Sequence, residues 1–182
     1  NAASNIESFT GGGRSNVASG ARSFVGGGCG NTSSGNQATI AAGKGNTASG
    51  VCSVVGGGFG NVASGARSAI LGGSINRAES SRAFIGNGNG NLVTGSDSSI
   101  VGGGSHTVDG DGAVIAGGYN NTAAGLYASI IGGYYNTIAS AVSYGFIGNG
   151  YSNEITSGYG TLIGGGCNST INGGEYSSIV GG

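Results

Sequence analysis

The residues that could support catalysis or metal binding are few, and the sequence does not bring them together. There is one histidine, His106, and there are three cysteines, Cys29, Cys52 and Cys167. Zinc sites are usually marked by cysteines or histidines a few residues apart, as in C-x-x-C, and no such motif occurs. We therefore predict no metal site and no cofactor. We expect the cysteines to be free thiols or, at Cys29 or Cys167, to link neighbouring chains.

The segment 109–112 comes nearest to a cation-binding motif. It reads Asp-Gly-Asp-Gly, but two carboxylates fall short of the roughly six to eight oxygen ligands that calcium takes. Glycine runs such as 26–28 lack the helix and the Lys-Ser/Thr pair of a phosphate-binding loop. An active site also needs polar groups that converge in a cleft. We therefore predict no catalytic residue and expect that the chain is not an enzyme.

The composition excludes several classes of protein. Glycine supplies 45 of 182 residues, proline is absent, and only 7% of the residues are charged. Collagen needs a glycine at every third residue and abundant proline, while a disordered chain is highly charged and poor in β-branched residues. No apolar run approaches the ~20 residues of a membrane helix, and no basic stripe suits nucleic acid. We therefore expect no contact with membrane or nucleic acid and a regular, glycine-rich fold.

Asparagine recurs at a fixed interval along the chain, which is the mark of a repeat protein. It recurs every fifteen residues from Asn1, and His106 stands in one place where asparagine is due. The interval lengthens by two residues at Asn153, returns to fifteen at Asn168, and lengthens by two again in the last coil. We expect most of these side chains to form a ladder along the axis: Asn16, Asn31, Asn46, Asn61, Asn76, Asn91, Asn121 and Asn136.

Other positions of the repeat, counted from each asparagine, are as regular as the first. Position 13 is glycine throughout, and small or apolar residues at positions 1, 3, 5, 8, 10 and 12 alternate with variable ones. This period of two predicts two short strands in each coil, with glycine at the corners. Position 10 should supply the core: Val25, Ile40, Val55, Ile70, Ile85, Ile100, Ile115, Ile130, Ile147, Leu162 and Ile179.

These patterns predict an all-β protein, a parallel β-solenoid of twelve coils of about fifteen residues that forms a single domain over residues 1–182. One such coil encloses little more than one isoleucine and one alanine. A core this thin would gain from sharing apolar surface with neighbouring chains. We therefore expect a homo-oligomer.

The recurring pattern S-x-I-x-G-G-x-x-N-x-A-x-G, as at Ser68–Gly73 followed by Asn76, resembles the head repeats of trimeric autotransporter adhesins of the YadA type. Repeats in the shafts of phage and large-virus fibres are similar. The resemblance implies a left-handed β-roll, three chains side by side as a homotrimer, and an extracellular place on a cell or virion surface. It implies that the chain is part of a longer fibre-like protein that attaches to a host surface.

Two uneven distributions along the chain could carry a binding function. All eight tyrosines lie in the C-terminal part, and Tyr119, Tyr134 and Tyr151 share position 14 of successive coils. A column of tyrosines can stack on sugar rings or contact a protein, although it can equally stiffen the corner. All six Lys and Arg residues lie between Arg14 and Arg82. We take the tyrosine column as the candidate site for a host-surface glycan or protein.

Three functional hypotheses follow. The first is a structural and adhesive rod of a surface appendage, and the second is the shaft of a phage or virus tail fibre or spike. The third is a monomeric solenoid that binds a small or crystalline ligand such as ice. Ice binding would favour flat rows of threonine, and position 2 offers an interrupted row: Thr32, Thr47, Thr107, Thr122 and Thr137.

Overall fold

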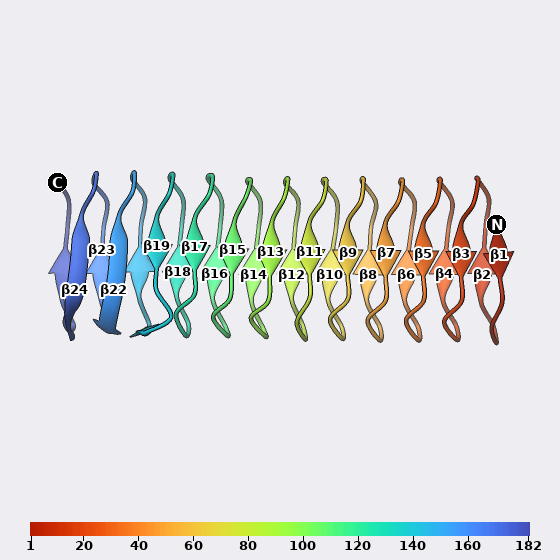
Figure 1. Ribbon diagram of the computed structural model, residues 1–182, viewed down its shortest axis with the longest axis horizontal. Helices are drawn as coiled ribbons and strands as arrows, with labels where there is room; N and C mark the ends of the chain where they lie inside the picture. Colours follow the sequence, from red (N-terminus) through yellow and green to blue (C-terminus); the bar gives the residue numbers. More distant parts are fainter. The chain divides into compact units, whose positions relative to one another are not determined.

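A computed structural model describes residues 1–182, and all of its regular secondary structure is β. The chain winds into a parallel β-solenoid of about twelve coils, which confirms the predicted fold class. It divides into two compact units, residues 1–90 and residues 91–182. Each unit is a stack of coils with two strands per coil (Figure 1). No helix of the structure is long and apolar enough to cross a membrane.

In the N-terminal unit the strands form two parallel sheets, one from each side of the coil. The first sheet contains β1 (Ala2–Ala3), β3 (Val17–Ala18), β5 (Thr32–Ser33), β7 (Thr47–Ala48), β9 (Val62–Ala63) and β11 (Arg77–Ala78). The second sheet contains β2 (Phe9–Thr10), β4 (Phe24–Val25), β6 (Thr39–Ile40), β8 (Val54–Val55), β10 (Ala69–Ile70) and β12 (Phe84–Ile85).

The C-terminal unit repeats this plan, with longer strands near its end. Its first sheet contains β13 (Leu92–Val93), β15 (Thr107–Val108), β17 (Thr122–Ala123), β19 (Thr137–Ile138), β20 (Val142–Ser143), β22 (Glu154–Tyr159) and β24 (Thr170–Glu175). Its second sheet contains β14 (Ser99–Ile100), β16 (Val114–Ile115), β18 (Ser129–Ile130), β21 (Phe146–Ile147), β23 (Leu162–Ile163) and β25 (Ser178–Ile179).

The strand register follows the fifteen-residue repeat. Ile40 pairs with Val55, and Val55 pairs with Ile70, so each residue lies over its equivalent in the next coil. Successive side chains of a strand point to opposite faces. One residue of each two-residue strand therefore lies inside the coil, and its neighbour lies on the surface.

Two turns close each coil, and both need left-handed backbone. One turn has its left-handed residue at position 7, which is occupied by side chains as large as those of Arg67 (φ 58°) and Tyr127 (φ 52°). The other turn uses glycine at position 13. A Cβ atom on Gly118 (φ 96°) would lie 2.2 Å from the carbonyl oxygen of Gly133 in the next coil. Backbone dihedral and close approach therefore both require glycine there.

The interior of the coils is narrow and, except in the first and last coils, enclosed. Position 10 supplies one aliphatic side chain per coil, from Val25 in the N-terminal unit to Ile147 in the C-terminal unit, and these side chains have no exposed surface. Alanine, valine or isoleucine at position 3, such as Ala48 or Ile138, packs beside it. Ile179, in the last coil, is half-buried.

The prediction that Leu162 belongs to the core is wrong. Leu162 is 37% exposed, whereas Ile163 is fully buried and pairs with Ile147 and Ile179. The sequence placed two extra residues in the last coil, but the structure places one in each of the last two coils. The long strands β22 and β24 take up the extra residues, with register shifts between them. Leu162 and Ile163 are both apolar, so the sequence pattern could not show which of them lies in the core.

The same shift displaces Asn168 from the asparagine ladder. Its place is taken by Ser169, whose backbone amide donates to Oδ1 of Asn153 at 3.0 Å. Asn168 instead lies at the turn with φ 55°.

The two outer faces of the coils differ in chemistry. Outward positions of the first sheet carry mostly serine and threonine, including the threonines of position 2. Outward positions of the second sheet, 9 and 11, carry no charged residue in either unit. The large apolar side chains exposed on this second face are Phe9, Phe24, Val54, Leu71, Val101, Ile131, Leu162 and Val180.

Candidate functional site

Each buried asparagine of the ladder satisfies backbone groups of three coils. Oδ1 of Asn31 accepts a hydrogen bond from the backbone amide of Asn46 at 3.0 Å. Nδ2 of Asn31 donates to the carbonyls of Gly27 and Gly43, both at 2.9 Å. The primary amide of asparagine offers two donors and an acceptor on a short side chain. The ladder thus ties the glycine corners to the next coil and has a structural role.

His106 fills its ladder position only in part. Nδ1 accepts a hydrogen bond from the backbone amide of Asn121 at 3.1 Å, as an asparagine Oδ1 would. Nε2 is buried and makes no hydrogen bond. Burial lowers the pKa of His106 below its usual value, and the backbone groups of Gly118 and Asn121 beside the ring offset this effect in part. His106 belongs to no group of three or more His, Cys, Asp or Glu side chains that could hold a metal ion.

The other reactive groups are dispersed. Cys29, Cys52 and Cys167 are free thiols on three different coils. No group of three or more His, Cys, Asp or Glu side chains could hold a metal ion. Asp109 accepts a hydrogen bond from the hydroxyl of Thr94, and Asp111 accepts one from the backbone amide of Ser96. The structure contains no pocket in either unit.

The predicted tyrosine column lies at a turn of the C-terminal unit. The backbones of Tyr119, Tyr134 and Tyr151 pair from coil to coil. The rings of Tyr119 and Tyr134 are 6.0 Å apart between centroids. Tyr135, the next residue along, places its ring edge-on to both Tyr119 and Tyr151, at 6.4 and 6.0 Å. We call these four residues the first tyrosine corner.

A second tyrosine corner, at the other turn of the same coils, was not predicted. The ring of Tyr127 stacks on that of Tyr144 at 5.2 Å, Tyr144 contacts Tyr159 at 5.2 Å, and Tyr159 contacts Tyr176 at 5.8 Å. The insertions in the last coils hid this column, because they move its members to different places in the fifteen-residue count. A count from the following strand, rather than from the asparagine, would have aligned Tyr127, Tyr144 and Tyr176, each of which lies two residues before its strand.

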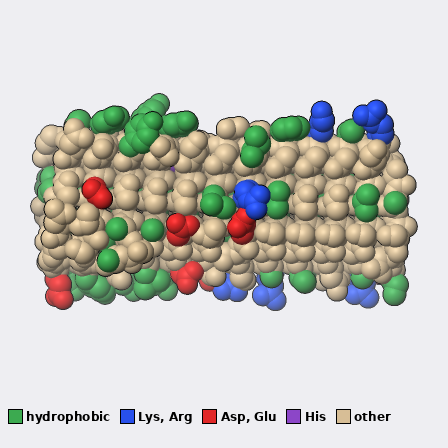
Figure 2. Space-filling view, in the orientation of Figure 1, with side chains coloured by type: hydrophobic (Ala, Val, Ile, Leu, Met, Phe, Trp, Pro, Cys, Tyr) green, Lys and Arg blue, Asp and Glu red, His purple; other side chains and the backbone are tan.

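All eight tyrosines are substantially exposed, from 44% for Tyr119 to 72% for Tyr176. None of their hydroxyl groups makes a hydrogen bond within the chain. Tyrosine that is exposed in clusters, with a free hydroxyl, is typical of interaction surfaces. Figure 2 shows hydrophobic side chains, a class that includes tyrosine, along both edges of the C-terminal unit. The two corners can therefore offer aromatic rings and hydroxyl groups to a partner.

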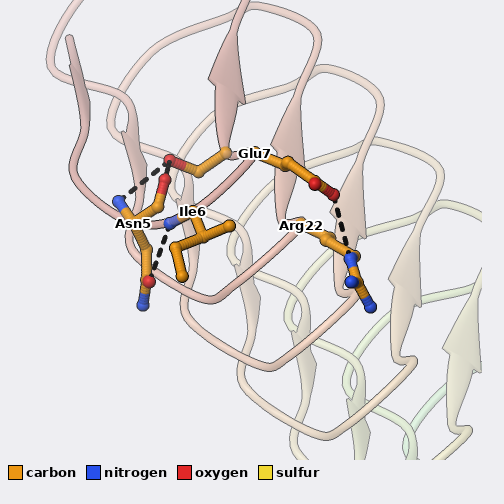
Figure 3. Close-up of polar contacts among 5 residues, drawn as sticks. Asn5, Ile6, Glu7 and Arg22 are labelled. Carbon is orange, nitrogen blue, oxygen red and sulfur yellow. Dashed lines mark hydrogen bonds and ion pairs between the residues drawn. The ribbon is translucent and has the colours of Figure 1, made fainter.

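The same turns of the N-terminal unit carry cations. At position 7, Nε of Arg22 reaches back one coil to Oε2 of Glu7 at 2.9 Å (Figure 3). At position 14, Nζ of Lys44 lies 5.8 Å from the centroid of the Phe59 ring, one coil further on. A cation and an aromatic ring in adjacent coils of one column are thus within reach of each other.

A search of protein-family models and of curated proteins finds no match to this chain.

Proposed function

We propose that this chain is the repeat segment of a surface appendage, a structural and adhesive fibre element that packs side by side as a homotrimer. One observation carries the proposal. The outer face of the second sheet is apolar and uncharged in both units, while the outer face of the first sheet is largely polar.

The packing inside the coil supports the same view. The coils between the first and the last bury one aliphatic side chain at position 10 and one residue at position 3, most often alanine. Phe24, Val54 and Leu71 lie outside this core and are exposed to solvent in a single chain. Burial of such a face stabilises a protein by about 25 cal/mol per Å² of apolar area. Neighbouring copies would supply the cover that the coil itself cannot.

The adhesive part of the proposal rests on the first tyrosine corner. Its rings are exposed and their hydroxyl groups are free, so they suit a glycan or protein on a host surface. The resemblance of the repeat to the heads of trimeric adhesins and to viral fibre shafts agrees with an extracellular role. In phage or virus the same architecture would form the shaft of a tail fibre or spike.

Solution mass tests the trimer. Light scattering on a sizing column, under reducing conditions, should give three times the 17.2 kDa mass of the chain. The double substitution Val54→Glu and Leu71→Glu puts two charges on the apolar face and should lower the mass to that of one chain. Thr32→Glu with Thr47→Glu, on the opposite face, is the matched control and should leave the mass unchanged. A single-chain mass for the wild type would contradict the trimer.

Binding to immobilised glycans and matrix proteins tests the adhesive role. Replacing Tyr119, Tyr134 and Tyr151 together by serine should abolish binding without changing the circular dichroism spectrum. Phe59→Ser, in the same column of the N-terminal unit, is the control and should bind as the wild type does. Binding that survives the triple substitution would rule out a role for the first tyrosine corner.

A further inference from the structure

The charged residues of the chain are divided between its two units. Residues 1–90 contain all six Lys and Arg residues and two acids, Glu7 and Glu79, so this unit carries a charge of +4. Residues 91–182 contain five acids and no Lys or Arg, so that unit carries −5. The two values add to the −1 of the whole chain. Lys and Arg side chains project from the edges of the N-terminal unit in Figure 2.

The cations occupy the turns that tyrosines occupy in the other unit. Arg22, Arg67 and Arg82 all lie at the left-handed residue of position 7, with φ of 56–58°. Tyr127, Tyr144 and Tyr176 have the same backbone conformation, with φ of 52–57°, in the C-terminal unit. Position 14 repeats the division, with Arg14 and Lys44 in one unit and the first tyrosine corner in the other. Arg77, on the outer face of β11, is the one cation outside these two turns.

We infer that the position-7 arginines of one molecule dock on the second tyrosine corner of another molecule. The rings of Tyr127 and Tyr144 stack on each other, so this corner offers its free hydroxyl groups to a partner, and arginine side chains can donate hydrogen bonds to these hydroxyl oxygens. The net charges of +4 and −5 draw these units of different copies together and keep like units apart. The occupant of the tyrosine corner is therefore a second copy of this chain.

The spacing of the two columns is matched because both belong to the same solenoid. Arg67 and Arg82 lie in successive coils, as Tyr127 and Tyr144 do, and adjacent coils of any β-solenoid are about 4.8 Å apart. Two or more arginines can therefore meet two or more rings in one register. The free tyrosine hydroxyl groups of successive coils can therefore accept hydrogen bonds from successive guanidinium groups.

This contact is separate from the side-by-side packing proposed above. It uses the turns and not the apolar face, and it depends on charge. The Val54→Glu and Leu71→Glu variant, which should lose the trimer, should keep it. The two proposals can therefore fail independently.

Two complementary variants test the inference. One variant replaces Arg22, Arg67 and Arg82 by glutamine, and the other replaces Tyr127, Tyr144 and Tyr176 by asparagine, which tolerates left-handed backbone. Each is labelled with a fluorophore and followed by sedimentation and energy transfer at low ionic strength. The wild type should associate beyond its basal mass, and neither variant alone should. An equimolar mixture should associate again, since each supplies the column that the other lacks.

Salt and a matched control complete the experiment. Screening should weaken the wild-type association by on the order of tenfold between low and high ionic strength. Arg77→Gln removes one positive charge outside the turns and should associate as the wild type does, whereas Arg67→Gln, which removes one charge at position 7, should associate less. The inference is overturned if the wild type does not associate, if salt has no effect, if either variant associates alone, or if the mixture fails to associate.

Discussion

The backbone amide of Asn46 donates a hydrogen bond to Oδ1 of Asn31, one coil back, at 3.0 Å. Asn46 repeats the arrangement: Oδ1 accepts from the amide of Asn61, and Nδ2 donates to the carbonyls of Ala42 and Gly58. One side chain thus satisfies the Asn61 amide and the Ala42 carbonyl, and it adds a second bond to the Gly58 carbonyl, which also accepts from the amide of Lys44. Buried backbone groups in native proteins are nearly always paired, which explains why this position tolerates so few residue types.

Asn46→Ala should therefore be costly although it removes no apolar contact. The substitution leaves the Asn61 amide and the Ala42 carbonyl without the bonds that Asn46 provides. A buried donor or acceptor left without a partner costs roughly 1–3 kcal/mol, so we expect a loss above about 2 kcal/mol in the free energy of unfolding. Urea unfolding measures it. Asn46→Asp should be worse, because it loses both donors and buries a charge. A stability equal to that of the wild type would show that the ladder is dispensable.

The repeat made most of the fold predictable, and the exceptions have a physical origin. A residue such as Ile115 recurs every fifteen residues because each coil must lie on the next in register, so periodicity alone predicts the sheets. The register failed at Leu162, where two adjacent apolar residues fit the pattern equally well. Three residues of the first tyrosine corner share position 14 of the repeat and were predicted to lie together, whereas Tyr135 was not. The second was missed because contacts such as that of Tyr144 with Tyr159 depend on insertions that the strands absorb.

His106→Asn should stabilise the protein and make it less sensitive to acid. Burial lowers the pKa of His106 in the folded chain, so the unfolded chain takes up the proton first as the pH falls. The stability associated with the neutral ring is present above the unfolded value of about 6.5 and is lost as the pH falls below it. An asparagine would also bring a side-chain amide that donates hydrogen bonds, as the other asparagines of the ladder do, whereas Nε2 of His106 makes none.

Urea unfolding of the wild type and the His106→Asn variant at pH 7.5 and 5.5 gives the comparison. The wild type should lose up to about 1.4 kcal/mol more than the variant for each pH unit below 6.5. The acidic residues are identical in both proteins, so their contribution cancels. Equal losses would mean that His106 titrates as it does in the unfolded chain.

Ser53→Ala should be neutral or stabilising, which is unusual for a substitution at a buried position. Oγ of Ser53 is buried without a hydrogen-bond partner, and alanine already occupies this position in the coil before it, at Ala38. Removal of an unsatisfied hydroxyl should raise the free energy of unfolding by about 1 kcal/mol.

Ser98→Ala is the matched control in the C-terminal unit. Oγ of Ser98 donates to the carbonyl of Gly110 at 2.7 Å and accepts from the amide of Ala113 at 3.2 Å. The same chemical change should therefore lower the stability by about 1 kcal/mol. Thermal or urea unfolding of both variants measures these opposite effects. A loss of stability in Ser53→Ala would show that the Ser53 hydroxyl has a hydrogen-bond partner.

Substitutions at Leu162 and Ile163 separate the register of the structure from that of the sequence pattern. Ile163 is fully buried between Ile147 and Ile179, whereas Leu162 faces outward. Ile163→Thr loses apolar contacts and buries a hydroxyl, and we expect a loss of about 2 kcal/mol or more. Leu162→Thr should cost much less in a single chain, because its side chain stays in contact with water. The measurement is the unfolding midpoint of each variant in urea, with the oligomer first dissociated by Val54→Glu and Leu71→Glu. A larger loss at Leu162 would restore the fifteen-residue count and place Asn168, rather than Ser169, in the ladder.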